Sequence, residues 1–295
     1  MTPGYQLPHG SPLLRVGFVA LALALAGLFV AAVYISARRT GRDPRVALRQ
    51  GAVAAACTTA WIAATGLLAS RGVLRMWDPP TMGLVLGPTL LVAIGVAVSP
   101  LGRQFIAGIP IQWLVGFQGF RVLVELLLHR AYVEGLMPVQ MSWSGRNFDV
   151  VSGITAVAVG LWLATAVRAS SLLVALWNTL GVALLANILL VALLSAPTPF
   201  RVFTNDPPNV FITRAPWVWL PAVMVFAAIL GHALVIRWLL GQMRSQGDST
   251  PLPPRQRTTG HATTTLLPAL RSRFRHLRAP GPSGPHVARP GAFQP

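Results

Sequence analysis

Long uninterrupted apolar segments dominate this sequence and constrain what it can fold into. A helix needs about 20 apolar residues to cross the hydrocarbon core of a bilayer. Seven segments are candidates: residues 13–36, 46–69, 82–98, 105–128, 150–167, 171–194 and 216–240. The third contains Gly87-Pro88, where a break is expected, and the fourth begins either at Phe105 or after Pro110. Because their apolar residues form blocks and do not alternate with polar ones, the pattern indicates membrane spans. We therefore predict an all-α integral membrane bundle of about seven transmembrane helices over residues 1–240.

The composition agrees with this interpretation. The chain is 54% hydrophobic and only 11% charged, whereas a soluble domain usually carries about 25% charged residues. A chain this apolar cannot cover itself with a polar surface, so the lipid bilayer is its predicted solvent. The single cysteine, Cys57, lies within an apolar block, and we expect it to be a small buried hydrophobic residue.

Arginine supplies every basic side chain, and the net charge is +17. The arginines follow the ends of apolar blocks, which favours membrane topology over nucleic-acid binding. Five follow the first block, at positions 38, 39, 42, 45 and 49. If the N-terminus lies outside, this group, Arg103, Arg168 and the C-terminal segment all lie inside. The bias predicts a multi-pass protein of the inner (plasma) membrane with its N-terminus outside and its C-terminus in the cytoplasm.

The C-terminal segment, residues 241–295, is rich in Pro, Arg, Thr, Gly and Ser. Such a composition cannot bury enough apolar surface to fold, so we predict a disordered cytoplasmic tail. Within it, residues 266–278 carry apolar side chains at helical spacing. Four arginines lie mostly off that face: Arg271, Arg273, Arg275 and Arg278. This pattern favours an amphipathic helix on anionic lipid head groups, and an ordinary basic tail is the equal alternative.

A polar stripe interrupts the fourth apolar segment. Gln118, Arg121, Glu125 and His129 recur at spacings of three or four residues, so they share one face of a helix. A charge at the middle of a bilayer costs at least about 2.5–3.5 kcal/mol. Pairing between Arg121 and Glu125 would offset part of that cost. The stripe is therefore expected to face the bundle interior or a water-filled cavity.

A second polar group precedes the fifth segment. Arg146, Asn147 and Asp149 follow Gly145, which permits a tight turn. Asn147 can cap the next helix with its side-chain oxygen, and Asp149 would complement the dipole of that helix. These roles give a complete structural account. In the functional alternative, Arg146 and Asp149 extend the polar wall that the fourth segment begins.

These residues form the candidate ligand- or ion-binding set: Gln118, Arg121, Glu125, His129, Arg146, Asn147 and Asp149. An ionisable residue inside a membrane is a functional-site hypothesis by default, but an Arg–Glu pair can also be a structural clamp between helices. We weigh the two interpretations about equally. His232, in the seventh segment, is expected to be a core histidine and not a haem ligand.

Part of this region resembles a known family. The stretches Phe120-Arg121-x-x-Val124-Glu125, Glu134-Gly135-x-x-Pro138-x-x-Met141 and Gly145-Arg146-Asn147-Phe148-Asp149 are similar to a family of uncharacterised bacterial multi-pass membrane proteins. The resemblance covers residues 118–156. It implies a bacterial inner membrane and carries no implication for chemistry.

Motifs of soluble catalysis are absent from the sequence. It has no Gly-rich phosphate loop, H-E-x-x-H or G-x-S-x-G, so an enzyme is the third choice and no metal or cofactor is predicted. Two functions remain. The first is transport or binding of a small molecule or ion in an outer-facing polar pocket. The second is a non-catalytic membrane subunit, sensor or assembly factor that contacts a membrane protein partner.

Overall fold

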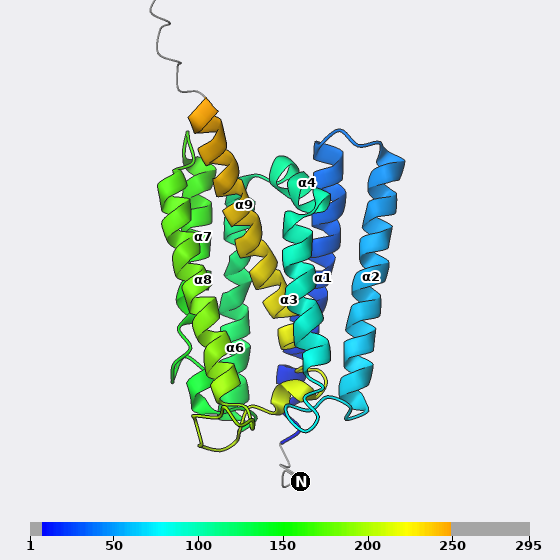
Figure 1. Cartoon of the computed structure of the whole chain (residues 1–295), viewed down its shortest axis with the longest axis vertical. Coiled ribbons are helices and arrows are strands. Elements are labelled where there is room, and N and C mark those ends of the chain that lie inside the picture. The colour runs from blue at the N-terminus through cyan, green and yellow to red at the C-terminus, as the bar shows by residue number, and fades with distance from the viewer. Residues whose placement is uncertain (1–7, 249–295) are drawn as a thin grey trace, which may run out of the picture. The chain divides into compact units, whose positions relative to one another are not determined.

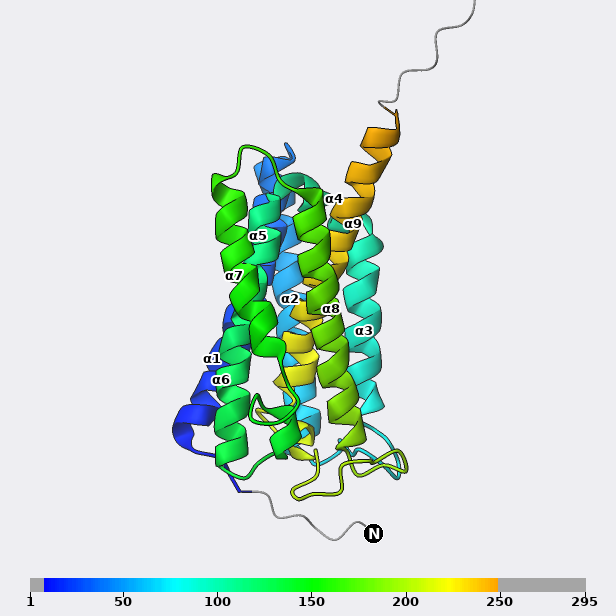
Figure 2. The same ribbon diagram turned by 90° about the vertical axis from the view of Figure 1, so that its left-hand side faces the viewer.

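The computed structural model describes residues 8–248, and within them the chain forms helices and no strands (Figure 1). The elements are α1 (Pro12–Arg39), α2 (Pro44–Ser70), α3 (Gly83–Val98), α4 (Pro100–Gly108), α5 (Ile111–Gly116), η1 (Phe117–Gly119), α6 (Phe120–Val133), η2 (Val139–Met141), α7 (Asp149–Thr165), α8 (Ser171–Leu194), η3 (Phe211–Thr213), η4 (Leu220–Val225) and α9 (Phe226–Asp248). The long helices lie side by side (Figures 1 and 2). We call the end where α1 begins the N-terminal end of the bundle, and the end where α9 finishes the C-terminal end.

The membrane-spanning character of the chain is confirmed in its general form. Among the described residues, five helical stretches are long and apolar enough to cross a membrane, and the bent pair α3–α4 makes a sixth if it is one span. The five are Pro12–Arg39, Pro44–Ser70, Ile111–Val133, Ser171–Leu194 and Leu220–Arg244. Helix α7 is apolar but has only 17 residues.

Proline breaks the third segment at a different place from the one predicted. The sequence suggested a break at Gly87-Pro88, but α3 continues through Pro88. The break falls at Ser99-Pro100, where the axes of α3 and α4 differ by 63°. Ser99 has an extended backbone, and its hydroxyl accepts hydrogen bonds from the N–H groups of Leu101 and Gly102. A capping serine followed by proline at the first helical position starts a new helix.

The fourth segment begins after Pro110, the later of the two predicted starts. Residues 105–108 belong to α4, and the spanning stretch starts at Ile111. Ile109 is extended, with φ −114° and ψ 118°, as the residue before a proline prefers. Pro110 thus separates the short α4 from the helix that carries the polar stripe.

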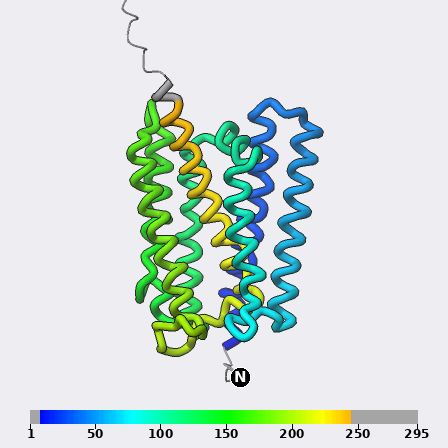
Figure 3. The backbone as a smooth tube through the Cα atoms, in the orientation of Figure 1, coloured from blue at the N-terminus to red at the C-terminus, as the bar shows by residue number. Residues whose placement is uncertain are grey.

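Helix α2 lies at the edge of the bundle and packs mainly on α1 (Figures 1 and 3). Two indole groups attach it to η4: Trp61 donates to the Ala222 carbonyl at 3.0 Å, and Trp219 donates to the Ile62 carbonyl at 3.1 Å. Only 11% of the most apolar 18-residue stretch of α2 is buried. Cys57 is exposed on this helix, so its predicted burial is wrong, because α2 has neighbours on one side only.

Glycines bring the polar stripe close to α7. A Cβ atom at Gly160 would lie 2.8 Å from the Cα atom of Gly116, and one at Gly153 would lie 2.8 Å from the backbone nitrogen of Val122. Real Cβ atoms do not approach other atoms this closely, so only glycine fits at either position. Small residues allow helix backbones to approach closely inside membranes. This approach places Arg121 opposite the first turns of α7.

The last helix is longer than predicted. Helix α9 continues beyond residue 240 to Asp248, so the predicted tail begins later than residue 241. The proposed amphipathic stretch at 266–278, with Arg271, Arg273, Arg275 and Arg278, lies outside the described residues.

Glu134 fastens the start of α1 to the end of α6. Its carboxylate accepts hydrogen bonds from the Ser11 backbone N–H, the Ser11 hydroxyl and Arg130 Nε, each at 2.6 Å. Ser11 also caps α1 by accepting from the Leu14 N–H. Partial burial raises the pKa of the Glu134 carboxyl, but the hydrogen bonds from Ser11 and Arg130 together outweigh it and lower that pKa.

The hydrogen bonds of the Glu134 carboxylate predict that the stability of the fold falls in acid. A carboxyl whose pKa is lower in the folded state stabilises the fold above its unfolded pKa, and the stabilisation is lost as the pH falls through the folded pKa. We expect Glu134→Gln to lower the free energy of unfolding by about 1 kcal/mol at pH 7. Between about pH 5 and pH 3, the variant should lose less of its stability than wild type does. Thermal unfolding in mild detergent across that range tests this. A variant with the same acid response as wild type would contradict it.

Candidate functional site

Arg121 is the centre of a buried polar network that joins four helices. Its side chain is 1% exposed. Nε donates to Asp149 Oδ2 at 2.6 Å, and Nη2 pairs with Asp149 Oδ1. Nη1 donates to Ser152 Oγ at 2.9 Å and to the Gly181 carbonyl at 3.4 Å. The bidentate pair joins α6 to α7, and the bond to the Gly181 carbonyl adds α8.

His232 brings α9 into the same network. Its Nε2 lies 2.7 Å from Arg121 Nη1, and its Nδ1 lies 2.9 Å from Asn178 Oδ1. Arginine can only donate, so Nε2 must accept, and the ring proton is on Nδ1 and points at Asn178. His232 is 2% exposed, as expected of a core histidine. Its partner was not predictable, because Arg121 lies 111 residues away along the chain.

Glu125 does not pair directly with Arg121, contrary to the pairing suggested by their spacing. Arg121 uses Asp149 as its carboxylate partner, because the close approach of α7 brings Asp149 against the guanidinium. Glu125 Oε1 accepts from Asn147 Nδ2 at 2.6 Å. Glu125 is 1% exposed, and among the described residues its Oε2 has no hydrogen-bond partner.

Asn147 connects Glu125 to the start of α7. Its Nδ2 donates to the Met141 carbonyl at 3.0 Å as well as to Glu125. Its Oδ1 accepts from the Asp149 N–H at 3.1 Å, but the predicted cap is not formed, because the N-cap position of α7 is Phe148 and no side chain caps the helix. Asp149 occupies the first turn of α7, where its charge complements the helix dipole. The segment before α7 therefore covers Glu125 from the N-terminal end of the bundle.

Gln118 is buried one turn before Arg121. Its Nε2 donates to the Ala228 carbonyl of α9 at 3.1 Å. Its Oε1 has no hydrogen-bond partner among the described residues and is inaccessible to solvent. Gly231 makes room for this side chain, because a Cβ there would collide with it.

His129 and Arg146 do not join the network. His129 is half-buried and stacks on Trp143, with ring centroids 4.3 Å apart. Arg146 is exposed and lies over the Phe203 ring, 5.3 Å from its centroid. The predicted set thus divides into five buried residues and two that lie outside the network, His129 on α6 and Arg146 in the loop before α7.

A separate polar cluster links the loops at that end. Asn205 donates to Gln140 Oε1 at 2.9 Å, and Gln140 donates to Ser195 Oγ at 2.8 Å. Arg201 and Asp206 form an ion pair at 3.7 Å. These bonds tie the loop after α8 to η2, which lies in the segment that covers Glu125.

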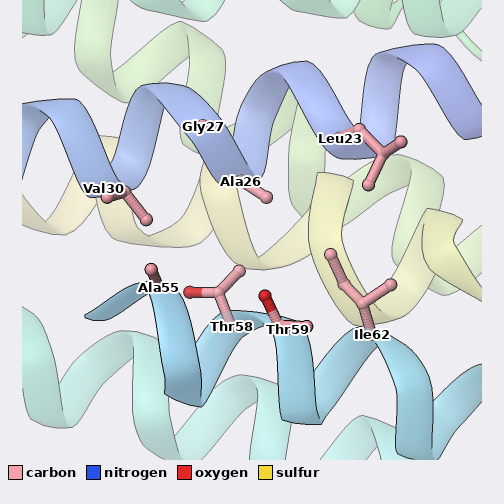
Figure 4. Close-up of a pocket in the computed structure, with 8 residues that line it drawn as sticks. All are labelled: Leu23, Ala26, Gly27, Val30, Ala55, Thr58, Thr59 and Ile62. Carbon is pink, nitrogen blue, oxygen red and sulfur yellow. The ribbon is translucent and has the colours of Figure 1, made fainter. Parts of the chain in front are cut away.

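The buried network is closed in this structure. Gln118 and Asn147 are 0% exposed, and Asp149 is 6% exposed, so the five residues do not line an open vestibule as the pocket hypothesis requires. A cavity of about 360 Å³ lies elsewhere, between α1 and α2 (Figure 4). Its lining is apolar apart from Thr58 and Thr59, and it does not include the network.

No protein family, curated protein or solved structure matches this chain. The resemblance at residues 118–156 therefore remains a prediction, and the site must be interpreted from its own geometry.

Proposed function

We propose that the protein crosses a bacterial inner membrane seven times, with the N-terminal end of the bundle outside. The seventh crossing would be α7, which at 17 residues measures about 25 Å at 1.5 Å per residue. Arginines support the orientation. The helix ends and loops of the C-terminal end carry nine of them: Arg38, Arg39, Arg42, Arg45, Arg49, Arg103, Arg168, Arg237 and Arg244. The other end carries seven: Arg15, Arg71, Arg75, Arg130, Arg146, Arg201 and Arg214. The bacterial inner membrane follows from the family resemblance alone.

We infer that this protein binds and moves a proton or a small cation through Glu125. The observation that carries this proposal is Glu125 Oε2, a carboxyl oxygen that is buried and has no hydrogen-bond partner among the described residues. Burying an unpartnered charged carboxylate is costly. A bound proton or cation would remove that cost. A purely structural carboxylate would be expected to have both oxygens occupied.

In this proposal Arg121 supports Glu125 and does not itself hold an anion. Its donors are directed at Asp149, Ser152, Gly181 and His232. Arg121 thus fixes the helix positions around Glu125 and contributes a positive field there. In this proposal the structure is an occluded state, and release of Asn147 from Glu125 opens the site toward the N-terminal end.

Glu125→Gln tests the proposal. We expect the variant to fold, because glutamine can still accept from Asn147. We expect it to lose proton movement, because an amide cannot take up a proton at neutral pH. Wild type in liposomes that contain a pH-sensitive dye should change the internal pH when a K⁺ gradient and valinomycin set a membrane potential. Glu134→Gln is the matched control, since it changes the chain's other glutamate outside the spans. Proton flux in Glu125→Gln equal to that of wild type would contradict a proton-carrying role.

A small bound cation is the other form of the proposal, and native mass spectrometry distinguishes it. A small species bound to wild type and absent from Glu125→Gln would identify the ligand. If neither measurement separates the variant from wild type, the binding proposal fails and the network is a structural clamp.

A non-catalytic membrane subunit is the second candidate. The observation that favours it is α2, whose apolar surface is mostly uncovered within the chain. A partner helix would pack on the exposed side that includes Val53 and Leu67. In that case a co-purifying membrane protein should persist in Glu125→Gln and be lost in Val53→Arg, as native mass spectrometry would show.

A further inference from the structure

The corner between α3 and α4 carries Arg103 and is contacted by the Arg237 side chain at the C-terminal end of the bundle. Helices α3, α4 and α9 contact one another there (Figure 1). Arg237 of α9 donates from Nη1 to the carbonyl of Ser99 at 2.8 Å and also to that of Ala97. The backbone N–H of Arg103 donates to the same Ser99 carbonyl at 3.2 Å. This last bond is the ordinary i→i−4 bond of the first turn of α4, so the Arg237 guanidinium lies beside the turn that carries Arg103.

These two arginines carry unbalanced positive charge. Arg103 is exposed and Arg237 is partly exposed, and both guanidinium groups are positively charged. The ion pairs of the described residues are Arg121–Asp149, Arg130–Glu134 and Arg201–Asp206, so neither corner arginine has a carboxylate partner. Two like charges held close together without an acid nearby suit a bound anion.

An apolar groove on α3 ends at the same corner. It has a volume of about 420 Å³ and is lined by Leu91, Val92, Gly95, Val96 and Ser99. Leu91 is 72% exposed and Val92 is 52% exposed, so in a membrane this surface faces lipid. Gly95 leaves open space where a side chain would otherwise lie. The groove runs from the apolar part of α3 to Ser99, whose carbonyl accepts from the Arg237 side chain and from the Arg103 backbone N–H.

We propose that this corner binds one anionic phospholipid of the membrane leaflet at the C-terminal end, with its phosphate between Arg103 and Arg237 and an acyl chain in the groove. An apolar channel that leads to a pair of cations matches the two parts of such a lipid. Juxtamembrane arginines attract anionic lipids of the cytoplasmic leaflet. The site belongs to the helix bundle, is independent of the predicted tail helix, and does not depend on the role of Glu125.

Native mass spectrometry of the full chain tests this site with added phosphatidylglycerol, and with phosphatidylcholine as the zwitterionic comparison. Wild type should retain one phosphatidylglycerol more firmly than phosphatidylcholine. Arg103→Gln should weaken that binding by about fivefold to tenfold, the effect of losing one charge-assisted contact. Gly95→Leu should weaken it to a similar degree by filling the groove. Since nothing lies within 4 Å of a Cβ at Gly95, this variant is expected to fold.

Arg168→Gln is the matched control, because Arg168 is exposed in the loop between α7 and α8 at the same end of the bundle and its loss changes the net charge equally. The proposal predicts unchanged binding in this control. Equal losses in Arg103→Gln and Arg168→Gln would overturn it in favour of general charge attraction. Unchanged binding in Arg103→Gln or in Gly95→Leu would also overturn it. So would displacement of the lipid by millimolar inorganic phosphate, since that would indicate a site for a soluble anion.

Discussion

Replacing Arg121 with alanine is expected to destabilise the fold by about 3–5 kcal/mol, the largest effect of any single side-chain truncation in the network. The variant leaves Asp149 buried at 6% exposure without its cation, and it removes the donors to Ser152 and Gly181. Charge burial without a partner is what makes this change so costly. Titration with a denaturing detergent, followed by circular dichroism, measures the loss.

Two comparisons separate this effect from a general loss of arginine. Arg130→Ala removes an arginine that also makes a 2.6 Å Nε bond to a carboxylate, but the Arg130 side chain is 56% exposed, so its pair is expected to contribute about 0–1 kcal/mol. The double variant Arg121→Met with Asp149→Leu removes both charges and should recover much of the stability. If Arg121→Ala were no more harmful than Arg130→Ala, the network would not hold the helices together.

Gly160→Val is expected to have a comparable effect for a different reason. The new Cβ would lie 2.8 Å from the Cα atom of Gly116 and 3.1 Å from the carbonyl oxygen of Gln112. Backbone atoms cannot move aside as a flexible side chain can, so α7 must separate from α5. The expected cost is about 3 kcal/mol or more, together with loss of the alignment that brings Asp149 to Arg121.

Gly27→Val is the control for this substitution, because nothing lies within 4 Å of a Cβ at Gly27. It makes the same chemical change in another apolar helix. Thermal unfolding in detergent should distinguish the two variants by several degrees. Similar melting temperatures would show that α5 and α7 are farther apart at Gly160 than the structure indicates.

The helices were predictable from the sequence because the lengths of the apolar blocks determine them. Residues 171–194 form α8 as predicted, and the first two helices differ from prediction only at their ends. The errors arose at prolines. Pro88 lies within α3, whereas Pro100 starts a new helix because Ser99 can cap it. Proline composition alone does not distinguish these cases.

The candidate site was predictable where it depends on spacing along one helix. Gln118, Arg121 and Glu125 are all buried, as a polar stripe in an apolar helix requires. The pairing of Arg121 with Asp149 depends on the distance between α6 and α7, which glycines such as Gly153 determine. His129 was assigned by its spacing, but it is only half-buried and stacks on Trp143. Contacts across the bundle, such as that of His232, have no signal in one sequence.

The order of the network along the chain has a consequence for biosynthesis. Arg121 precedes Asp149 by 28 residues and His232 by 111 residues, so the insertion machinery receives the arginine before either partner has been translated. An arginine at the centre of a lone helix costs about 2.5–3.5 kcal/mol on insertion. We therefore expect α6 to remain beside the translocation channel until α7 emerges, and the two to enter the lipid as a helical hairpin. Nascent chains stalled before Asp149 should then stay bound to the channel, whereas chains stalled after α7 should be released into the bilayer.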